Sequence, residues 1–275
     1  MHDDSRGRQV RKQIETTATP RQVWDAWTDP TKLAQWFVDD AKGSPEVGTT
    51  FEWSFDMVPH PIPYQVVEAE LDKRFVLALQ LPDRPRGVLE IDIESRGGKT
   101  VIRLVNSGFQ DGAEWDNEYE GIDSGWEMAL ATLRHYLENH FGHDKRAFLL
   151  LRPTPVLPDA DRFYRDEAGL AQWLTESGVP GSVGSDCRLV LRDGGSVTGT
   201  VLAQTAAETA IAWSEGSGVL ELKGFWAGAQ AMACIRGVGW GWNAERAAEW
   251  ESAFTPAVER LAAVIAEDHA NAHGQ

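Results

Sequence analysis

Several features are scarce in this chain of 275 residues, and each scarcity excludes a class of protein. There are only two cysteines, Cys187 and Cys234, which are too few for a disulfide framework. No run of about 18 apolar residues could form a transmembrane helix. The stretch MHDDSRGRQV lacks the apolar segment of a secretory signal. We therefore expect a cytoplasmic protein that does not bind a membrane.

Basic side chains are also few. The chain carries 26 lysines and arginines against 42 acidic side chains, a net charge of −16. Residues 1–144 contain 15 basic and 26 acidic side chains, and the rest of the chain is acidic as well. A surplus of negative charge opposes binding to nucleic acid or to anionic lipid. The sequence therefore indicates no nucleic-acid partner.

The strongest periodic pattern lies between Glu114 and Phe141. Apolar residues recur there at spacings of three and four, which predicts one long helix with an apolar stripe. They are Ile122, Trp126, Ala129, Leu130, Leu133 and Leu137. Upstream residues predict short helices and strands. The simplest architecture is an antiparallel sheet that curves around this helix and can leave a cavity beneath it.

A second pattern alternates apolar and polar side chains over Thr49–Met57, which predicts a half-buried strand. Four large side chains share one face of it: Phe51, Trp53, Phe55 and Met57. Further strands are predicted at 8–16, Tyr64–Leu71, Phe75–Leu81, Val88–Glu94 and Thr100–Ser107.

The order of motifs then starts again in the second half of the chain. Leu33-Ala34-Gln35-Trp36 returns as Leu170-Ala171-Gln172-Trp173, and Gly87-Val88-Leu89-Glu90 returns as Gly218-Val219-Leu220-Glu221. The helix pattern returns at Ala244–Asp268, where Pro256 predicts a kink or a late start. The offset between the copies decreases along the chain, as deletions in loops would cause. We predict a tandem duplication with domains at residues 8–143 and 145–269.

The stretch Ala18–Pro30 (ATPRQVWDAWTDP), followed by Leu33-Ala34-Gln35-Trp36-Phe37, resembles the START-like superfamily (SRPBCC). The nearest branch is that of domains homologous to the activator of heat-shock-protein ATPase. The second copy is degenerate, since Leu189 stands where the first has Trp53. The resemblance implies an α+β fold of two helix-grip domains, each a curved antiparallel sheet around a long C-terminal helix. It also implies binding of small apolar ligands, while some relatives are polyketide cyclases or aromatases and some act on chaperones.

The strand and the long helix together predict the wall of an apolar pocket in the first domain. The candidate ligand-binding residues are Trp36, Phe37, Phe51, Trp53, Phe55, Met57, Tyr64, Ile122 and Trp126. Aromatic and methionine side chains suit a flat apolar ligand, although they would also fill a closed core. The matching strand of the second copy offers the smaller Cys187, Leu189 and Leu191, so we expect a collapsed core there.

No catalytic, metal or cofactor site is predicted. His60 lies in a proline-rich loop, where it could orient a polar ligand group or simply be exposed. His140 and His143 have a spacing used by metal ligands, but no acid or cysteine is placed to complete a site. The acids from Asp116 to Glu127 suit the positive end of a helix dipole better than a general base.

The sequence thus favours a non-catalytic protein that buries a small hydrophobic molecule between the sheet and the long helix of its first domain. A module that associates with a chaperone and a cyclase-like enzyme are the alternatives. A buried carboxylate or histidine aimed into the cavity would favour the enzyme. A closed, filled core would favour the interaction module.

Overall fold

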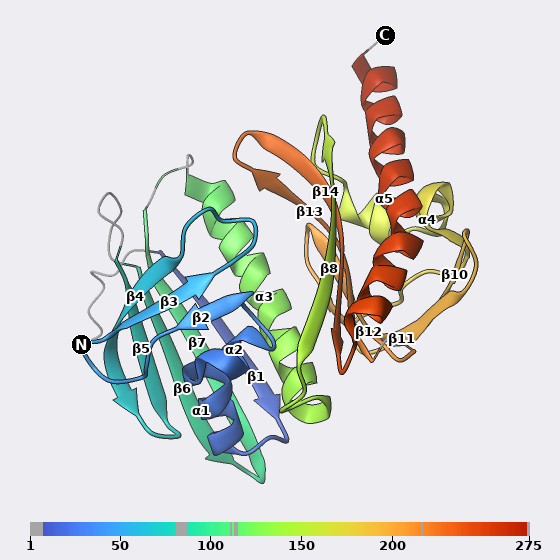
Figure 1. Ribbon diagram of the computed structural model, residues 1–275. Coiled ribbons are helices and arrows are strands. Elements are labelled where there is room, and N and C mark those ends of the chain that lie inside the picture. The colour runs from blue at the N-terminus through green and yellow to red at the C-terminus, as the bar shows by residue number, and fades with distance from the viewer. Residues whose placement is uncertain (1–7, 81–86, 111, 113–114, 216, 274–275) are drawn as a thin grey trace. The chain divides into compact units, whose positions relative to one another are not determined.

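The computed structural model describes residues 8–80, 87–110, 112, 115–215 and 217–273, which divide into two compact units, Met1–His143 and Asp144–Gln275. The first unit contains β1 (Arg8–Thr16), α1 (Pro20–Thr28), α2 (Pro30–Ala34), β2 (Asp40–Lys42), β3 (Thr50–Ser54), β4 (Ile62–Glu70), β5 (Arg74–Leu79), β6 (Val88–Arg96), β7 (Lys99–Phe109) and α3 (Asp116–Asn139). Within this unit α3 lies along one face of the curved sheet (Figure 1).

The second unit repeats these elements in the same order (Figure 1). It contains β8 (Lys145–Thr154), a π-helical turn η3 (Asp161–Arg165), α4 (Glu167–Trp173), β9 (Thr175–Ser177), β10 (Asp186–Leu191), β11 (Ser196–Gln204), β12 (Glu208–Trp213), β13 (Gly218–Ala227), β14 (Gln230–Trp240) and α5 (Ala244–His273). Only the turn η3 differs in type from its counterpart, α1, among the described elements.

The described strands form two seven-stranded antiparallel sheets with the same topology. The orders are β1-β7-β6-β5-β4-β3-β2 and β8-β14-β13-β12-β11-β10-β9. In each sheet the first strand of the unit pairs with the last, and the remaining neighbours are consecutive in sequence. The predicted fold class, two helix-grip domains each with a sheet around its final helix, is therefore confirmed.

Hydrogen bonds at matching positions show that the two units repeat in detail. The Trp36 indole Nε1 donates to the Ala26 carbonyl at 2.9 Å, and the Trp173 Nε1 donates to the Phe163 carbonyl at the same distance. Both donors end the repeated Leu-Ala-Gln-Trp motif. The motif therefore recurs because each copy uses its tryptophan to tie together the two short helical segments.

A tight loop and a bulge recur as well. The Gly48 N–H donates to the Val66 carbonyl and the Gly184 N–H to the Val201 carbonyl, each at 2.8 Å. Both glycines have a positive φ, 90° and 85°, which strains any residue with a β-carbon. The strand register shifts directly after Val66 in one sheet and after Val201 in the other. Such a bulge increases the local twist and helps each sheet to curve around its helix.

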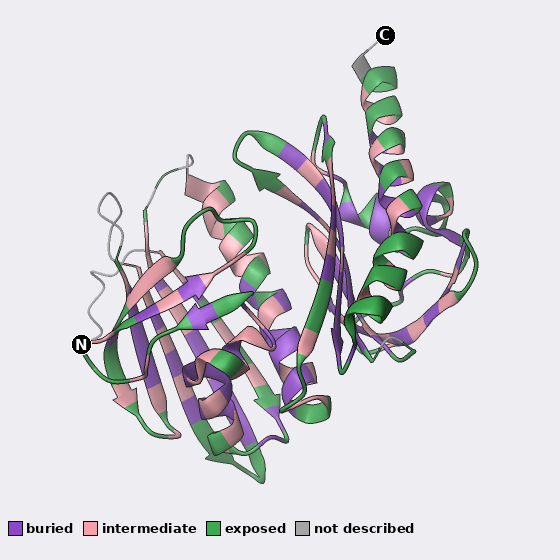
Figure 2. Cartoon of the chain, viewed as in Figure 1, coloured by how far each residue is buried: buried purple, intermediate pink, exposed green. Residues whose placement is uncertain are grey.

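The two long helices begin and end near the predicted residues. The first runs over Asp116–Asn139 and buries one face, which includes Leu130, Leu133 and Leu137. Along the strands that face this helix, such as β6, every second side chain is buried (Figure 2). The second helix starts at Ala244 and continues through Pro256, so the predicted late start is wrong. None of the described helices is long and apolar enough to cross a bilayer.

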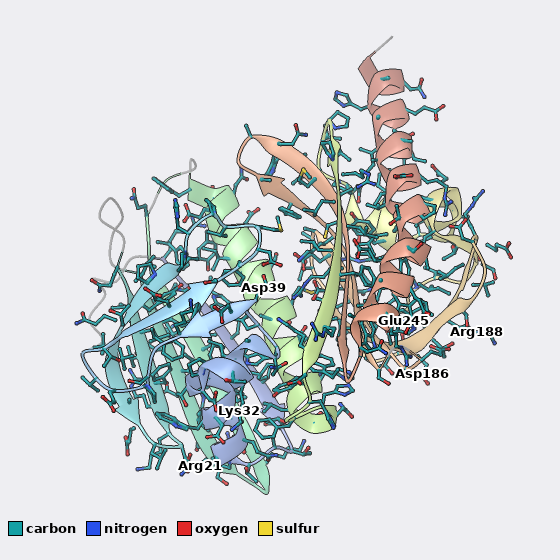
Figure 3. The ribbon with its side chains drawn as sticks, in the orientation of Figure 1. Arg21, Lys32, Asp39, Asp186, Arg188 and Glu245 are labelled. Atoms are coloured by element: carbon teal, nitrogen blue, oxygen red, sulfur yellow. The ribbon has the colours of Figure 1, made fainter. Side chains whose placement is uncertain are left out.

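The predicted strand Thr49–Met57 is too long. Strand β3 ends at Ser54, because Phe55 and the next residues form a turn closed by the Val58 N–H and the Phe55 carbonyl at 2.8 Å. Asp39, labelled in Figure 3, accepts the backbone N–H of Asp56 at 2.8 Å and fixes this turn. The short strand β2 was not predicted, since three residues show no periodicity.

Replacing Pro256 by alanine should stabilise the second unit. Pro256 is exposed inside α5, where proline removes a backbone hydrogen bond and crowds the preceding turn. We expect Pro256→Ala to raise the free energy of unfolding by about 1–3 kcal/mol, measured by urea unfolding of the full chain. The exposed Ser252→Ala, one turn earlier, is the control and should change it by less than about 0.5 kcal/mol. A loss of stability in Pro256→Ala would contradict this account of the helix.

Candidate functional site

The first unit contains a cavity of about 510 Å³ between its sheet and the start of α3. Strands β4, β5, β6 and β7, the loop before β4 and the first turns of α3 all contribute to its wall. The described lining residues are Val58, Pro59, His60, Pro61, Ile62, Tyr64, Leu79, Gly87, Leu89, Asn106, Ser107, Gly108, Phe109, Gln110, Trp115, Glu118, Ile122 and Trp126. Most of this wall is apolar, and the volume suits a small organic molecule.

Trp126 forms the boundary between the cavity and the aromatic core. On the core side its ring stacks on Phe37, with centroids 5.2 Å apart, and lies 6.1 Å from Trp27. On the cavity side its Nε1 donates to Asn106 Oδ1 at 3.1 Å. The Asn106 amide Nδ2 in turn donates to the Val88 carbonyl at 3.3 Å. The amide thus holds the indole against the sheet and keeps its ring on the cavity wall.

Tyr64 supplies a neutral polar group to the same cavity. Its ring packs on Trp53, with centroids 4.5 Å apart. Burial raises the pKa of the Tyr64 hydroxyl to about 12, so the group stays protonated at neutral pH. The hydroxyl forms no hydrogen bond with another described residue. It can therefore form one with a molecule bound in the cavity.

Three of the nine predicted site residues line the cavity: Tyr64, Ile122 and Trp126. The structure places Trp36, Phe51 and Trp53 in the core, each at most 2% exposed. Phe37 lies among the same rings, stacked on Trp36 with centroids 5.0 Å apart. Phe55 packs edge-on against Phe37, and Met57 is 44% exposed. These six side chains lie outside the cavity wall, because four pack in the aromatic core and the other two follow the end of β3.

Sequence reasoning missed most of the sheet wall, including Leu79, Leu89 and Asn106. One signal could have found Asn106. It follows Ile102 and Leu104 at a spacing of two on β7, so it occupies an inward position that a closed core would fill with an apolar residue. A polar residue at such a position indicates either a buried hydrogen bond or a cavity, and Asn106 has both.

The corresponding region of the second unit is filled by tryptophan. Strands β5 and β12 have the same length, which places Trp213 at the position of Leu79. The strand partner of Leu79 is Tyr64, and the partner of Trp213 is Gly199, where a side chain would clash with the backbone of β12. The large ring thus comes from the outer strand of the pair, as Tyr64 on β4, in the first copy, and from the inner strand, as Trp213 on β12, in the second.

Trp213 closes this region through contacts with three other rings. Its centroid lies 4.2 Å from Trp250, 5.9 Å from Phe254 and 6.1 Å from Trp242. The helix repeat aligns Trp250 with Ile122 and Phe254 with Trp126. The rings therefore occupy the space that corresponds to the cavity of the first unit.

Two glycines on β14 make room for these rings. A β-carbon on Gly237 would lie 2.2 Å from Phe148 Cε1, and one on Gly239 would lie 1.8 Å from Trp242 Cε2. Gly237 corresponds to Asn106, so the second copy lacks both the amide and the indole of the Asn106–Trp126 pair. The expected collapse of the second core agrees with this packing, in which rings fill the space and α5 lies close to both β8 and β14.

A second depression, of about 570 Å³, lies at the start of α5. Its described lining is mostly polar: Gly241, Asn243, Glu245, Arg246, Glu249 and Trp250. Glu245 is labelled in Figure 3. This depression is more open than the cavity of the first unit and offers little apolar surface, so we do not consider it the ligand site.

Among the described residues no three His, Cys, Asp or Glu side chains come together as metal ligands. The nearest approach is His135 and His140, with their Nε2 atoms 3.2 Å apart. Burial lowers the pKa of both imidazoles to about 4, with smaller contributions from neighbouring cations. At the cavity, His60 is exposed and Glu118 is half-buried.

The fold and the cavity define a START-like domain of the helix-grip type in the first unit. Residues 17–138 match the family described as "Activator of Hsp90 ATPase homolog 1-like protein". The chain therefore carries an AHSA1-type domain in its first half, as the sequence resemblance predicted. A search of curated proteins found no match.

Solved structures with similar folds cover either one half or nearly all of the chain. The Aha1 dimer from Colwellia psychrerythraea is 18% identical over 48% of this chain and 96% of its own, with a TM-score of 0.43. CalU16 from Micromonospora echinospora is 21% identical over 47% of this chain and 75% of its own, with a TM-score of 0.40. DynU16, a protein in the dynemicin biosynthetic locus, is 15% identical over 95% of this chain and 98% of its own, with a TM-score of 0.43. Similarities this low say nothing about function.

The hydrogen bond between Asn106 and Trp126 should be measurable by a double-mutant cycle. Asn106→Ala leaves the buried indole N–H without its acceptor, and we expect a loss of about 1–3 kcal/mol in the free energy of unfolding. Trp126→Phe removes the donor, as Phe254 does in the second copy. The double variant should therefore cost about 1 kcal/mol less than the sum of the two single variants. Strictly additive costs would show that the pair does not interact.

Proposed function

We propose that the first unit binds a small apolar or aromatic molecule in the cavity between its sheet and α3, without catalysing a reaction. The supporting observation is the contrast between two copies of one fold. The first keeps a largely apolar space of about 510 Å³, and the second fills the matching region with Trp213 and Trp250. This pocket is partly open, so its apolar lining stays in contact with water unless a ligand covers it.

The side chains around the cavity suit binding better than catalysis. General acid–base chemistry needs titratable groups that face each other in environments of different polarity. Of the acids and histidines on the described wall, one is the exposed His60 and the other is the half-buried Glu118 on α3. A cyclase-like activity therefore has no supporting pair of groups there.

Association with a chaperone is the second candidate, and the name of the matching family favours it. In that case the exposed surface of the first unit would carry the function, and filling the cavity would leave it intact. A cytoplasmic location is part of both proposals. Cys187 and Cys234 are free and buried, as is usual for proteins of a reducing compartment.

Filling the cavity with the residue used by the second copy should abolish ligand binding. We expect Ile122→Trp to lower the affinity for the neutral fluorescent probe N-phenyl-1-naphthylamine by about tenfold or more, because the indole occupies the probe's space. The measurement is a fluorescence titration of the full chain. The fold should persist, since Trp250 is accommodated at the matching position of α5.

The reciprocal change, Trp250→Ile, is the matched control. It should lower the stability of the second unit by about 1–3 kcal/mol and leave the affinity for the probe unchanged. Unchanged affinity in a folded Ile122→Trp variant would show that the probe binds elsewhere.

A further inference from the structure

We infer that Tyr64 determines part of the ligand specificity of the cavity, by donating a hydrogen bond from its hydroxyl to an oxygen atom of an aromatic ligand. This inference rests on the proposed ligand-binding function and adds the polar group by which the ligand is recognised. The class of ligand is an aromatic ring system that carries a carbonyl or similar oxygen acceptor. A hydrocarbon of the same shape lacks the acceptor.

The sheet around Tyr64 offers no side-chain acceptor for this hydroxyl. The strand partners of Tyr64 are Phe51 on β3 and Leu79 on β5. Ile62 and Val66 flank it on β4 at a spacing of two, so their side chains share its face of the sheet. All four neighbours are hydrocarbon side chains. The hydroxyl can therefore obtain a partner from the cavity that Tyr64 lines, either as water or as a ligand atom.

The hydroxyl of Tyr64 differs in this respect from the amide of Asn106, another hydrogen-bonding group on the wall. The Asn106 amide accepts the Trp126 indole N–H and donates to the Val88 carbonyl, so it is part of the packing of the protein itself. Tyr64 is held through its ring, which packs on Trp53. Its hydroxyl is thus not needed to fix the side chain and remains available to a ligand.

The two copies of the fold differ at this position. Gly199, the strand partner of Trp213, stands where the first copy has Tyr64, so the hydroxyl is missing from the copy whose space is filled by rings. The second unit does bury another tyrosine hydroxyl without a hydrogen-bond partner, that of Tyr164. Tyr164 is 0% exposed and belongs to the described lining of neither pocket. Its hydroxyl is therefore sealed from any ligand in the cavity.

The chemistry of the ligand decides what happens to the Tyr64 hydroxyl on binding. The cavity is partly open, so water can solvate the hydroxyl when no ligand is bound. A hydrocarbon ligand would displace this water and leave the buried hydroxyl unpaired, which is unfavourable. A ligand oxygen would replace the water as acceptor, because the hydroxyl stays protonated at neutral pH. Sites with such a polar group discriminate against analogues that lack the matching group.

Two ligands of nearly the same shape test this inference. 2-Acetonaphthone carries a carbonyl oxygen where 2-isopropylnaphthalene carries a methyl group. Their affinities are measured by displacement of N-phenyl-1-naphthylamine from the full chain. We expect Tyr64→Phe to weaken binding of the ketone about three- to tenfold and to leave binding of the hydrocarbon unchanged or tighter. Comparing each ligand between the two proteins cancels the greater hydrophobicity of the hydrocarbon.

Tyr164→Phe is the matched control, since it removes a buried hydroxyl outside the cavity. It should leave both affinities unchanged. Urea unfolding checks that both variants fold. Tyr64→Phe should retain the stability of the parent chain, because the hydroxyl that it removes makes no hydrogen bond to another described residue.

The outcomes separate the inference from the proposed function. If N-phenyl-1-naphthylamine and both ligands fail to bind, the proposed function fails and the inference fails with it. If Ile122→Trp abolishes binding of both ligands but Tyr64→Phe weakens them equally or not at all, the ligand site stands and the role of the hydroxyl is refuted. If Tyr164→Phe changes the affinity for the ketone as much as Tyr64→Phe does, the effect does not come from the cavity wall and the inference is overturned.

Discussion

The packing of one apolar helix face against a curved antiparallel sheet is the interaction on which both units depend. Leu133 and Leu137 on α3, and Leu261 and Ile265 on α5, are almost completely buried at matching positions. Their burial contributes the apolar contact that a two-layer domain needs. The recurring bulge and the recurring indole hydrogen bonds shape each unit around this contact. The two halves can therefore share a fold although few of their residues agree.

Once the backbone is set, side-chain volume decides whether the space beside the helix is a cavity or a core. The first copy places Leu79 and Ile122 where the second places Trp213 and Trp250. Dense packing of aromatic rings favours stability. The side chains around an open space lack those contacts, but the space can admit a ligand. The two copies thus represent two uses of one architecture, one suited to binding and the other to structural support.

The sequence predicted the fold well because the fold depends on periodicity. A spacing of three and four marked α3 and α5, a spacing of two marked the longer strands, and the repeated Leu-Ala-Gln-Trp motif marked the duplication. The site was predicted only in part, because its wall combines segments far apart in the chain. Phe55 and Met57 were misplaced because a turn ends β3 three residues before the alternation stops. Trp53 was misplaced because periodicity shows which face is inward but not whether that face is filled.

The most direct test of this account is fluorine NMR of the full chain with its 12 tryptophans replaced by 5-fluorotryptophan. Resonances assigned by single substitution would be followed while N-phenyl-1-naphthylamine is added. The account predicts that Trp115 and Trp126, which line the cavity, shift with the probe concentration, while Trp213 and Trp250 do not. Shifts confined to the tryptophans of the second unit, or equal in both units, would contradict it.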